Sequence, residues 1–462
     1  MIYALPFTAI IEQTSAIFED IFKGSGIDIF QIHHKSSIDE TLDLDRYSEI
    51  KFLMNSFSGE INITTFYQLI FAIFGNANQD NLKFNQLKNS VIIVDEVQAI
   101  PYELRADFLE ACEIISRKFG TIFILMSATM PIVGDSFIEL SNLEYFREQN
   151  RYEIEYLPLK SQDDLEENIE KFAKDKNTLC VVNSVAKSQE LFLKFKDKFN
   201  CYCLNGYMRD FDKERVIKTV SEKLKSGSEK VLLISTQSIE AGVDLDFEVG
   251  FREIAPISSI IQSAGRVNRE FKRGVSKLFV FDSVSENENL IYGMLLSVSR
   301  ELLNEIRDKS LKESELFGLS ERYFQKINRQ LESYLFEENM QLLEFETINK
   351  KLLNLMGDNE PKELVIIEPF EGFIKELEDE LFSIQSESID RFKKRDKTQA
   401  LVKKMLPFGV NIYSSDILKF KTNLEEIKLL KNIFYLPFGT VDYDEDFGVV
   451  KFREEESNLV FD

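Results

Sequence analysis

Short apolar runs alternate with helix-length amphipathic segments from residue 1 to about residue 285, and this alternation restricts the chain to few folds. Each apolar run is too short to form a helix, and several are rich in β-branched residues, so each predicts a buried strand. Strands that alternate with helices in this way assemble into parallel sheets. Strands are predicted at residues 90–94, 121–125, 179–182, 231–234 and 277–281, and helices at 102–118, 185–198 and 210–224.

A change of sequence pattern near residue 285 sets the predicted domain boundaries. A charged loop around residues 145–165 divides the α/β region into two lobes, over 1–150 and 151–285. Long Leu-, Glu- and Lys-rich helical stretches then continue to about residue 405, and short strand-like runs follow at 434–437 and 447–452. We therefore predict that residues 286–462 form a mostly helical domain with a small β element.

Composition excludes several classes of protein. No apolar run approaches the roughly 20 residues of a membrane-spanning helix, so we expect no membrane contact and a cytoplasmic location. The four cysteines include no C-x-x-C pair, and His33 and His34 are the only histidines, which argues against a zinc site or a His-rich metal nuclease site. The net charge of −23 argues against coating nucleic acid through bulk charge, although a local basic groove remains compatible with it.

Two adjacent carboxylates follow the buried strand predicted at residues 91–94. Open parallel sheets bind ligands at the carboxyl ends of their strands. One carboxylate there can hold Mg²⁺ beside nucleotide phosphates, and the next can position the water that attacks the γ-phosphate. We assign Asp95 to the metal and Glu96 to the water. The alternative is a solvated cap at the end of an ordinary strand.

Small hydroxyl residues follow the next predicted strand, where Thr121 to Met126 leads into Ser127-Ala128-Thr129. Their hydroxyls can bond to the segment from Asp95 to Gln98, because neighbouring parallel strands end at the same edge of a sheet. The separation of about thirty residues, with one helix between, makes the pair of motifs more specific than either alone. The alternative is a loop without function.

A polar loop that contains a glycine follows the buried strand predicted at residues 231–234. Gly242 permits close approach of the backbone to a ligand. Asp244 offers a carboxylate to a ribose hydroxyl or to an arginine, and Thr236 can contact a nucleic-acid phosphate. The alternative is an ordinary connection between a strand and a helix.

The string from Gln262 to Arg269 combines one glutamine with two arginines. Arg266 and Arg269 are three residues apart, and Gln262 precedes Arg266 by four, so a helix places all three on one face. Two guanidinium groups on one face can reach across a cleft and stabilise the charge of phosphoryl transfer. A solvated basic helix face is the alternative.

These four elements occur in the order that a superfamily 2 helicase requires. The strings at residues 95–98, 127–129 and 262–269 resemble that superfamily in general. The sequences at residues 2–13 and 235–244 resemble, more specifically, the helicase part of the CRISPR-associated helicase–nuclease of type I systems. The resemblance covers about residues 1–285.

The resemblance implies a fold and an activity. The fold is α/β, with two RecA-like parallel-sheet lobes, and the activity is hydrolysis of ATP with Mg²⁺ as cofactor. Gln98, Ser127 and Thr129 take the role of coupling nucleotide state to lobe movement. The family motor is recruited in antiviral defence to a crRNA-guided surveillance complex, loads on the displaced single-stranded DNA of an R-loop and moves 3′ to 5′, while a metal-dependent HD nuclease domain degrades that strand.

Four further positions match the family's DNA-contacting segments. Pro6 and Thr8 match the segment that follows the first DNA-contacting strand. Thr64 and Thr65, at the start of a helix predicted at 65–74, match the second DNA-contacting turn. The resemblance thus implies that both segments of the first lobe contact DNA.

The sequence departs from the family pattern at the phosphate-binding loop. The family has a Gly-rich loop that ends in Gly-Lys-Thr and cradles the phosphates with its backbone amides and its lysine. In this chain no glycine is followed by lysine. We therefore expect an incomplete first lobe without the P-loop strand and helix, and a motor that is not competent for ATP hydrolysis alone. It needs an upstream segment or subunit that carries the P-loop and the HD nuclease.

Two alternative functions stay open at the level of sequence. The chain could be a non-catalytic binding module that grips the surveillance complex or single-stranded DNA. It could also be another superfamily 2 enzyme, such as an RNA helicase. Two features argue against this: Gln98 stands in place of a terminal His or Asp in the motif, and the sequence of the first strand differs from that expected of such an enzyme.

Overall fold

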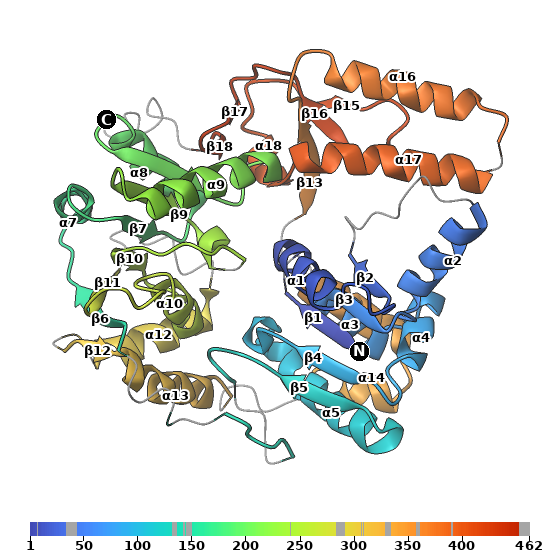
Figure 1. Cartoon of the computed structure of the whole chain (residues 1–462), viewed down its shortest axis with the longest axis horizontal. Helices are drawn as coiled ribbons and strands as arrows, with labels where there is room; N and C mark the ends of the chain where they lie inside the picture. Colours follow the sequence, from blue (N-terminus) through green and yellow to red (C-terminus); the bar gives the residue numbers. More distant parts are fainter. Residues whose placement is uncertain are drawn as a thin grey trace. The chain divides into compact units, whose positions relative to one another are not determined.

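The chain forms two compact units in the computed structural model (Figure 1). The first unit contains residues 1–146 and 317–359, and the second contains residues 147–316 and 360–462. We describe each unit by itself. The structure describes residues 1–6, 8–33, 44–131, 136–141, 144, 150–240, 242–282, 292–305, 307, 309–328, 334–356, 361–389 and 391–451.

The first unit is built on a parallel sheet with the strand order β2-β3-β1-β4-β5 among its described residues. Ile92 and Val94 of β4 are fully buried, since β4 is flanked by β1 and β5 and covered by helices. β5 lies at the edge of the sheet. The elements are β1 Ile2–Leu5, α1 Thr8–Ile21, β2 Ile29–Ile32, α2 Leu44–Asn55, β3 Ile61–Thr65, α3 Phe66–Phe74, α4 Asn78–Asn85, β4 Val91–Val94, η1 Val97–Ala99, η2 Tyr102–Leu104, α5 Arg105–Phe119 and β5 Ile122–Leu125.

A helical segment from later in the chain completes the first unit. It contains α13 Leu316–Asn328, α14 Glu337–Gln341 and α15 Phe345–Met356. Phe336 and Ile348 are buried in the same core as β4, and the backbone amide of Phe336 donates 3.0 Å to the Asp107 carboxylate on α5. Residues 317–359 therefore belong to the first unit, whereas the sequence pattern had grouped them with the C-terminal domain.

The second unit is built on a larger sheet with the strand order β12-β6-β11-β10-β7-β9-β8, in which only the short β12 pairs antiparallel among the described residues. Its central strands are buried on both faces, which explains their continuous apolar sequences. The elements are β6 Tyr152–Leu157, α7 Gln162–Ala173, β7 Thr178–Val181, α8 Val185–Phe195, β8 Asn200–Leu204, α9 Asp210–Ser226, β9 Val231–Ser235, η3 Gln237–Ile239, β10 Val249–Glu253, α10 Ile257–Ala264, β11 Ser276–Phe281, α12 Met294–Asn304, β12 Leu311–Lys312 and η5 Glu313–Glu315.

The segment predicted as a charged loop contains a strand instead. β6 alternates apolar and acidic residues, so Tyr152 and Ile154 are buried while Glu155 faces outward. Glu155 forms an ion pair of 2.7 Å with Lys277 on the adjacent strand β11. The prediction was wrong because overall charge was given more weight than the two-residue alternation, which is the stronger signal of a half-exposed strand.

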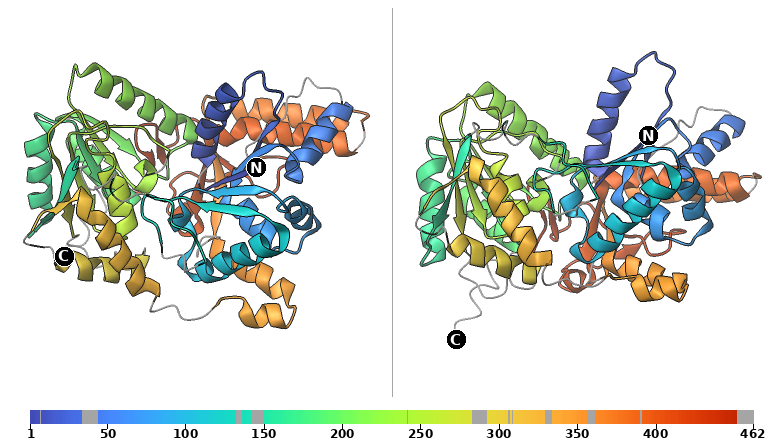
Figure 2. Two further views of the ribbon diagram at one scale, coloured as in Figure 1. Left: turned by 60° about the horizontal axis from the view of Figure 1, so that its bottom comes forward. Right: turned by 90° about the horizontal axis from the view of Figure 1, so that it is seen from below.

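The C-terminal part of the second unit contains a four-stranded sheet among its described residues, with the order β14-β13-β16-β15. This sheet is larger than the small β element predicted from sequence. Helices α16 and α17 lie side by side against it (Figure 2). The elements are β13 Lys362–Ile367, α16 Phe373–Ser386, α17 Arg391–Met405, η6 Leu406–Phe408, β14 Gly409–Tyr413, α18 Ser414–Ile417, β15 Glu425–Glu426, β16 Phe434–Leu436, β17 Tyr443–Asp444 and β18 Gly448–Val449.

The fold class predicted from sequence is confirmed. The chain is α/β, and each unit contains a parallel sheet in the place where the alternating pattern predicted one. All five predicted strands are present, within one or two residues of their expected bounds. None of the helices in the described part of the chain is long and apolar enough to cross a membrane.

Candidate functional site

Asp95 directly follows β4, at the carboxyl end of the first sheet. Its backbone amide donates 3.1 Å to the carbonyl of Ala4, which extends the pairing of β4 with β1. One carboxylate oxygen accepts a hydrogen bond of 2.9 Å from the amide of Glu96, and the other accepts one of 2.9 Å from the Tyr3 hydroxyl. The carboxylate is therefore held in a fixed orientation at the strand end.

Tyr3 is a site residue that the sequence analysis missed. It lies on β1 beside β4, and its ring contacts Phe18 edge-on, with ring centroids 5.8 Å apart. Burial, followed by the negative charge of Asp95, raises the pKa of the Tyr3 phenol. The phenol is therefore a hydrogen-bond donor at neutral pH. A register comparison of the two strands could have found it, because Tyr3 pairs with Ile93, two residues before Asp95.

Glu96 has a left-handed backbone conformation, with φ 56° and ψ 43°. This conformation costs a non-glycine residue roughly 1–2 kcal/mol, and such residues concentrate at functional sites. The Glu96 carboxylate accepts a hydrogen bond from the side-chain amide of Gln98. The sharp turn and this bond place Glu96 and Gln98 together immediately after the strand.

The predicted link between the two motifs of the first unit is formed by one residue pair. The Ser127 hydroxyl donates to the side-chain oxygen of Gln98, so β4 and β5 are joined just beyond their carboxyl ends. The amide of Val97 also donates 3.0 Å to the carbonyl of Met126. The hydroxyl of Thr129 is buried and has no hydrogen-bond partner among the described residues, but the backbone amide of Thr129 donates 2.9 Å to the Ser127 hydroxyl.

Arg105 supports the same turn from α5. Its guanidinium donates 3.0 Å to the carbonyl of Gln98 and lies over the ring of Phe324, 5.2 Å from the ring centroid. Burial lowers the pKa of Arg105 to about 10. The sequence pattern gave no sign of this contact, because Arg105 lies in an amphipathic helix where an arginine is normally a surface residue.

A divalent ion at Asp95 would need ligands from outside the protein. No group of three or more His, Cys, Asp or Glu side chains in the described part of the chain is arranged to hold a metal ion. Mg²⁺ commonly binds through one or two carboxylates and completes its octahedral shell with waters and substrate phosphates. Asp95 fits that mode, because each of its oxygens accepts one hydrogen bond and keeps a further lone pair.

The threonines predicted to contact DNA in the first unit have local structural roles. The Thr64 side chain is fully buried, and its hydroxyl donates 2.9 Å to the carbonyl of Ile32 on the neighbouring strand. Thr65 caps helix α3 by accepting from the amide of Gln68. Pro6 follows β1 and is partly buried, and Thr8 is the first residue of α1. Of these residues, Thr64 is the least suited to contact a ligand through its side chain.

The predicted loop of the second unit follows β9 as expected. Thr236 is buried, and its hydroxyl lies 3.2 Å from that of Ser238. Gly242 has a φ of 73°, a conformation that favours glycine. The carboxylate of Asp244 is largely exposed and forms an ion pair of 2.9 Å with Arg269. Of the two partners predicted for Asp244, the structure shows the arginine.

The two arginines of the string 262–269 do not share a helix face. Helix α10 ends at Ala264, and Val267 forms a β-bridge with Phe247, so the expected helical placement of Arg266 and Arg269 is wrong. The regular helix ends before Gly265, and the bridge then pairs Val267 with Phe247, two residues before β10. Gln262 remains within α10 and is partly exposed.

Because α10 ends before Arg266 and Arg269, the two arginines have different surroundings. Arg266 is buried and donates 2.6 Å to the carbonyl of Glu240. Arg269 is exposed, and its backbone amide donates 2.7 Å to Asp246. Arg266 is therefore fixed against the loop after β9, whereas the Arg269 side chain projects into solvent beside Asp244.

A buried ion pair between Arg252 and Glu240 supports this loop, and the sequence analysis missed it. Arg252 on β10 is fully buried and lies 3.1 Å from the Glu240 carboxylate. It also donates 2.8 Å to the side chain of Asn183, which follows β7. The pair therefore connects the loop after β9 to β10 and, through Asn183, to the end of β7, and removal of either partner would leave an uncompensated buried charge.

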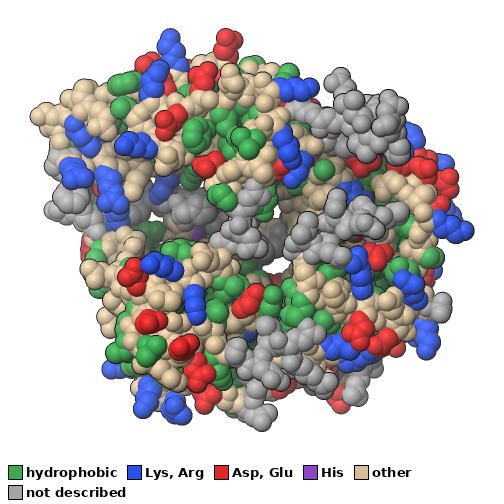
Figure 3. All heavy atoms as spheres, turned by 180° about the vertical axis from the view of Figure 1, so that it is seen from behind, with side chains coloured by type: hydrophobic (Ala, Val, Ile, Leu, Met, Phe, Trp, Pro, Cys, Tyr) green, Lys and Arg blue, Asp and Glu red, His purple; other side chains and the backbone are tan. Residues whose placement is uncertain are grey.

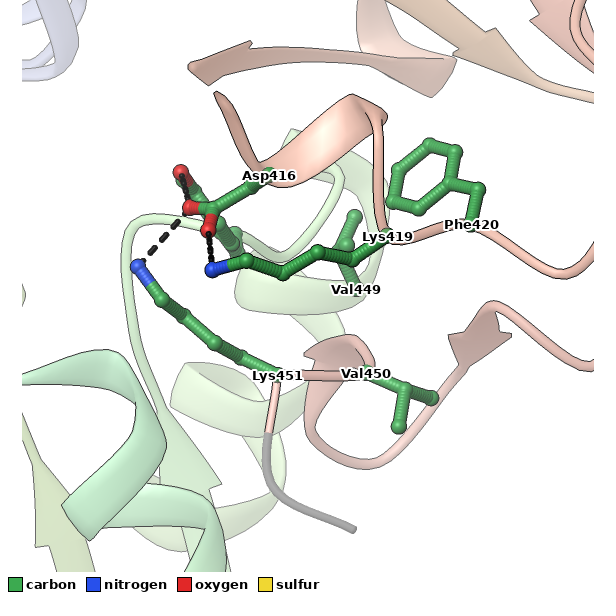
Figure 4. Close-up of a pocket in the computed structure, with 7 residues that line it drawn as sticks. Asp416, Lys419, Phe420, Val449, Val450 and Lys451 are labelled. Atoms are coloured by element: carbon green, nitrogen blue, oxygen red, sulfur yellow. Dashed lines mark hydrogen bonds and ion pairs between the residues drawn. The ribbon is translucent and has the colours of Figure 1, made fainter. Parts of the chain in front are cut away.

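A small pocket with a buried carboxylate lies where α18 and the end of β18 meet in the second unit (Figure 4). Asp416 accepts hydrogen bonds of 2.6 Å from the Tyr207 hydroxyl and 2.8 Å from Lys451, and it pairs with Lys419 at 3.1 Å. Three donors of the chain therefore surround the carboxylate, and the cluster ties the C-terminal sheet to the segment before α9.

Comparisons with known proteins agree with the resemblance read from the motifs. Residues 174–272 match a family model described as "CRISPR-associated nuclease/helicase Cas3, C-terminal". A CRISPR-associated nuclease/helicase Cas3 of Haloferax volcanii is 24% identical over 392 residues, which span 59% of this chain and 41% of that protein. The protein of the same name from Methanothermobacter thermautotrophicus is 31% identical over 253 residues, which span 48% of this chain and 30% of that protein.

The fold is also found among solved structures. A crystal structure of T. fusca Cas3 with ATP matches 94% of this chain and 62% of that chain, with a TM-score of 0.68 and 14% identity. This identity establishes likeness of fold alone. The chain spans less than half the length of the two curated relatives. Together these findings confirm the similarity of the chain to the helicase part of the Cas3 nuclease/helicases.

Proposed function

We propose that this chain, which is similar to the helicase part of the CRISPR-associated Cas3 proteins, is the ATP-dependent DNA helicase portion of a type I CRISPR interference effector. It acts on the displaced single strand of an R-loop beside a crRNA-guided surveillance complex. ATP and Mg²⁺ are its cofactors, and hydrolysis requires a polypeptide that supplies a phosphate-binding loop. The two curated relatives are much longer than this chain, and the proposal carries the helicase function in their names over to it.

The contact between Gln98 and Ser127 is the observation that carries the proposal. It joins the ends of β4 and β5, so Asp95, Glu96 and Gln98 stay in a fixed relation to the strand that follows them in the chain. We assign Asp95 to the Mg²⁺ ion and Glu96 to the attacking water. The Gln98–Ser127 bond then transmits a change at the nucleotide to β5, which is the coupling role proposed for these residues.

The second unit contributes the remaining proposed roles. Gln262, Arg266 and Arg269 act on the phosphates, and Arg269 is the one whose guanidinium is exposed. Gly242 and Asp244 contact the nucleotide, and Thr236 contacts the DNA backbone.

Stimulation of ATP hydrolysis by single-stranded DNA tests the proposal. The purified chain alone should show no hydrolysis above that of a Glu96→Gln variant, because nothing in it replaces the Gly-Lys-Thr loop. The chain mixed with, or fused to, a loop-bearing strand–helix segment from a helicase of the same family should hydrolyse ATP when DNA is added. The Glu96→Gln variant should lose at least about 100-fold of that turnover.

Three outcomes separate this function from its alternatives. Hydrolysis by the unaided chain that depends on Glu96 would overturn the requirement for an added loop. DNA binding without hydrolysis in the completed protein favours a non-catalytic binding module, for which the absence of a Gly-Lys pair is the supporting observation. Stimulation by single-stranded RNA in preference to 3′-tailed DNA would indicate an RNA helicase instead.

A further inference from the structure

Helix α17 is strongly basic in a chain whose net charge is −23. It contains seven lysines and arginines but a single acidic residue, Asp396. Leu401 and Met405 are buried on one side of it and, with the partly buried Val402, pack in an apolar core that includes residues of α16. The fold therefore leaves the sides of this helix that carry basic residues outside the apolar core, where those without a partner in the chain can attract a polyanion.

Several of the basic residues of α17 have partners within the chain. Lys397 pairs with Glu387 at 2.5 Å, Lys404 pairs with Glu380 at 3.5 Å, and Lys394 donates to the backbone carbonyl of Gln385. All three of these partners lie on α16 or in the turn that follows it. The acidic helix α16 thus balances one side of α17.

Arg391 and Arg395 form the unbalanced side. Both are exposed and lie four residues apart, so they share one helix face. Neither guanidinium group forms a hydrogen bond or an ion pair with any residue that the structure describes. On the face shown in Figure 3, basic side chains gather at the upper left, where the reversed view of Figure 1 places α16 and α17. Paired guanidinium groups at this spacing suit the phosphates of a nucleic-acid strand.

A row of aromatic rings lies at the other end of the same helix, where α17 leads into η6. The Phe408 ring lies 5.3 Å from that of Phe373 and 5.7 Å from that of Phe211 at the start of α9, and Phe370 lies 5.4 Å from Phe373. The two outer rings are half-exposed, with Phe370 at 49% and Phe211 at 52%. Exposed aromatic rings are surfaces on which the bases of single-stranded nucleic acids stack, and here they lie at the opposite end of α17 from Arg391 and Arg395.

We propose that α17 and this ring row form a single-stranded DNA contact in the second unit, separate from the motif residues. Arg391 and Arg395 bind backbone phosphates, and Phe370 and Phe211 stack on bases. The helix is about 22 Å long, so a strand that follows it contacts several nucleotides. The site rests on the proposed function for its ligand, DNA, but it is independent of ATP hydrolysis and of the phosphate-binding loop.

Binding of a fluorescent oligo(dT) to the full chain, measured by anisotropy over a range of salt concentrations, tests this site. The double variant Arg391→Gln/Arg395→Gln should bind at least about tenfold more weakly at 50 mM salt, and its slope of log K against log salt should be smaller by about 1.4. Phe370→Ala should weaken binding by about tenfold with an unchanged salt slope, because stacking releases no counterions.

The matched control is Lys397→Gln/Lys404→Gln, which removes the same charge from the side of α17 that faces α16. It should leave both affinity and salt slope close to those of the unmodified chain. Circular dichroism spectra of all variants check that α17 still folds.

The possible results distinguish this site from the proposed function. If the unmodified chain does not bind oligo(dT), the DNA-acting function fails and the site fails with it. If the chain binds but the arginine variant keeps the same affinity and slope, the site is refuted while the proposed function stands. Tighter binding of oligo(U) than of oligo(dT) would overturn DNA as the ligand.

Discussion

The hydroxyl of Tyr3 donates a hydrogen bond of 2.9 Å to the carboxylate of Asp95, so the first strand of the chain orients a carboxylate 92 residues later. The other oxygen of Asp95 accepts from the amide of Glu96. A carboxylate held at both oxygens loses little rotamer freedom when it binds a hydrated ion. Tyr3 is therefore a positioning residue for the proposed metal site.

Replacing Tyr3 with phenylalanine should remove this bond and leave the packing against Phe18 intact. We expect the free energy of unfolding of the first unit to fall by about 1 kcal/mol, the usual net value of one hydrogen bond. Because the chain has no tryptophan, urea titrations followed by circular dichroism are the suitable measurement. A double-mutant cycle with Asp95→Ala, which removes the acceptor, should give a coupling energy of similar size, and a coupling near zero would contradict the interaction.

Glu96 provides a test that separates backbone strain from side-chain chemistry. Glu96→Gly should be more stable than Glu96→Ala by about 0.5–1 kcal/mol, since both variants lose the bond from Gln98 and only glycine adopts a φ of 56° without steric cost, although it loses more entropy on folding. Glu96→Gln keeps both the strain and an acceptor, and should leave stability within about 0.5 kcal/mol. All three variants should lose at least about 100-fold of the hydrolysis in the completed motor. Equal thermal midpoints for Glu96→Gly and Glu96→Ala would show that the left-handed turn stores no strain.

The carboxyl-end site of the first sheet could be predicted from sequence because its parts are local. Asp95 follows an apolar run, and Ser127 follows the next one, so parallel pairing of the two strands brings them together. Tyr3 and Arg105 were missed because their contacts depend on strand register and on helix packing, which a local pattern does not encode. The same holds for the Arg252–Glu240 pair, whose members are separated by a loop and a strand.

The prediction that Arg266 and Arg269 share one helix face was wrong for a different reason. The spacing of the two arginines fits a helix, and the residues before them do form α10. Tertiary structure overrides this local preference, because Phe247 pairs with Val267 and ends the helix at Ala264. A glycine one residue before Arg266 was the available signal, since glycine commonly marks the end of a helix.

Gly448 lets the hairpin of β17 and β18 pack closely against Tyr207, and replacing this glycine should release the hairpin. The residue has a φ of 86°, and a Cβ atom there would overlap the backbone carbonyl of Tyr207. The amide of Val449 donates 2.9 Å to the same carbonyl, so Gly448→Ala should strain or break this bond. We expect a loss of at least about 2 kcal/mol, seen as faster amide exchange over residues 443–451.

Gly439→Ala is the matched control for Gly448→Ala. Gly439 also has a positive φ, of 73°, but no atom lies within 4 Å of the position that its Cβ would occupy. Its replacement should therefore cost only the conformational penalty of about 1 kcal/mol and leave exchange of the hairpin unchanged. Equal exchange in the two variants would mean that contact with Tyr207 does not hold the hairpin.

Asp416 should make the stability of the second unit depend on pH in the acid range. Burial opposes ionisation of this carboxylate, but the bonds from Lys451 and Tyr207 outweigh it and lower its pKa below the ordinary value of about 3.9. A lowered pKa means that folding favours the ionised form. Its contribution to stability is therefore fully present above about pH 4 and is lost as pH falls through the folded-state pKa.

Comparison of Asp416→Asn with the unmodified chain measures this contribution directly. The variant should be less stable by about 1–3 kcal/mol at pH 7, since it replaces a charged acceptor of several hydrogen bonds. The difference should stay constant between about pH 5 and pH 8 and shrink below about pH 4. Asp446→Asn, at an exposed ion pair with Arg215, should change stability by less than about 0.5 kcal/mol at any of these pH values. A difference for Asp416→Asn that persists unchanged at pH 3 would mean that the charge of this carboxylate does not stabilise the fold.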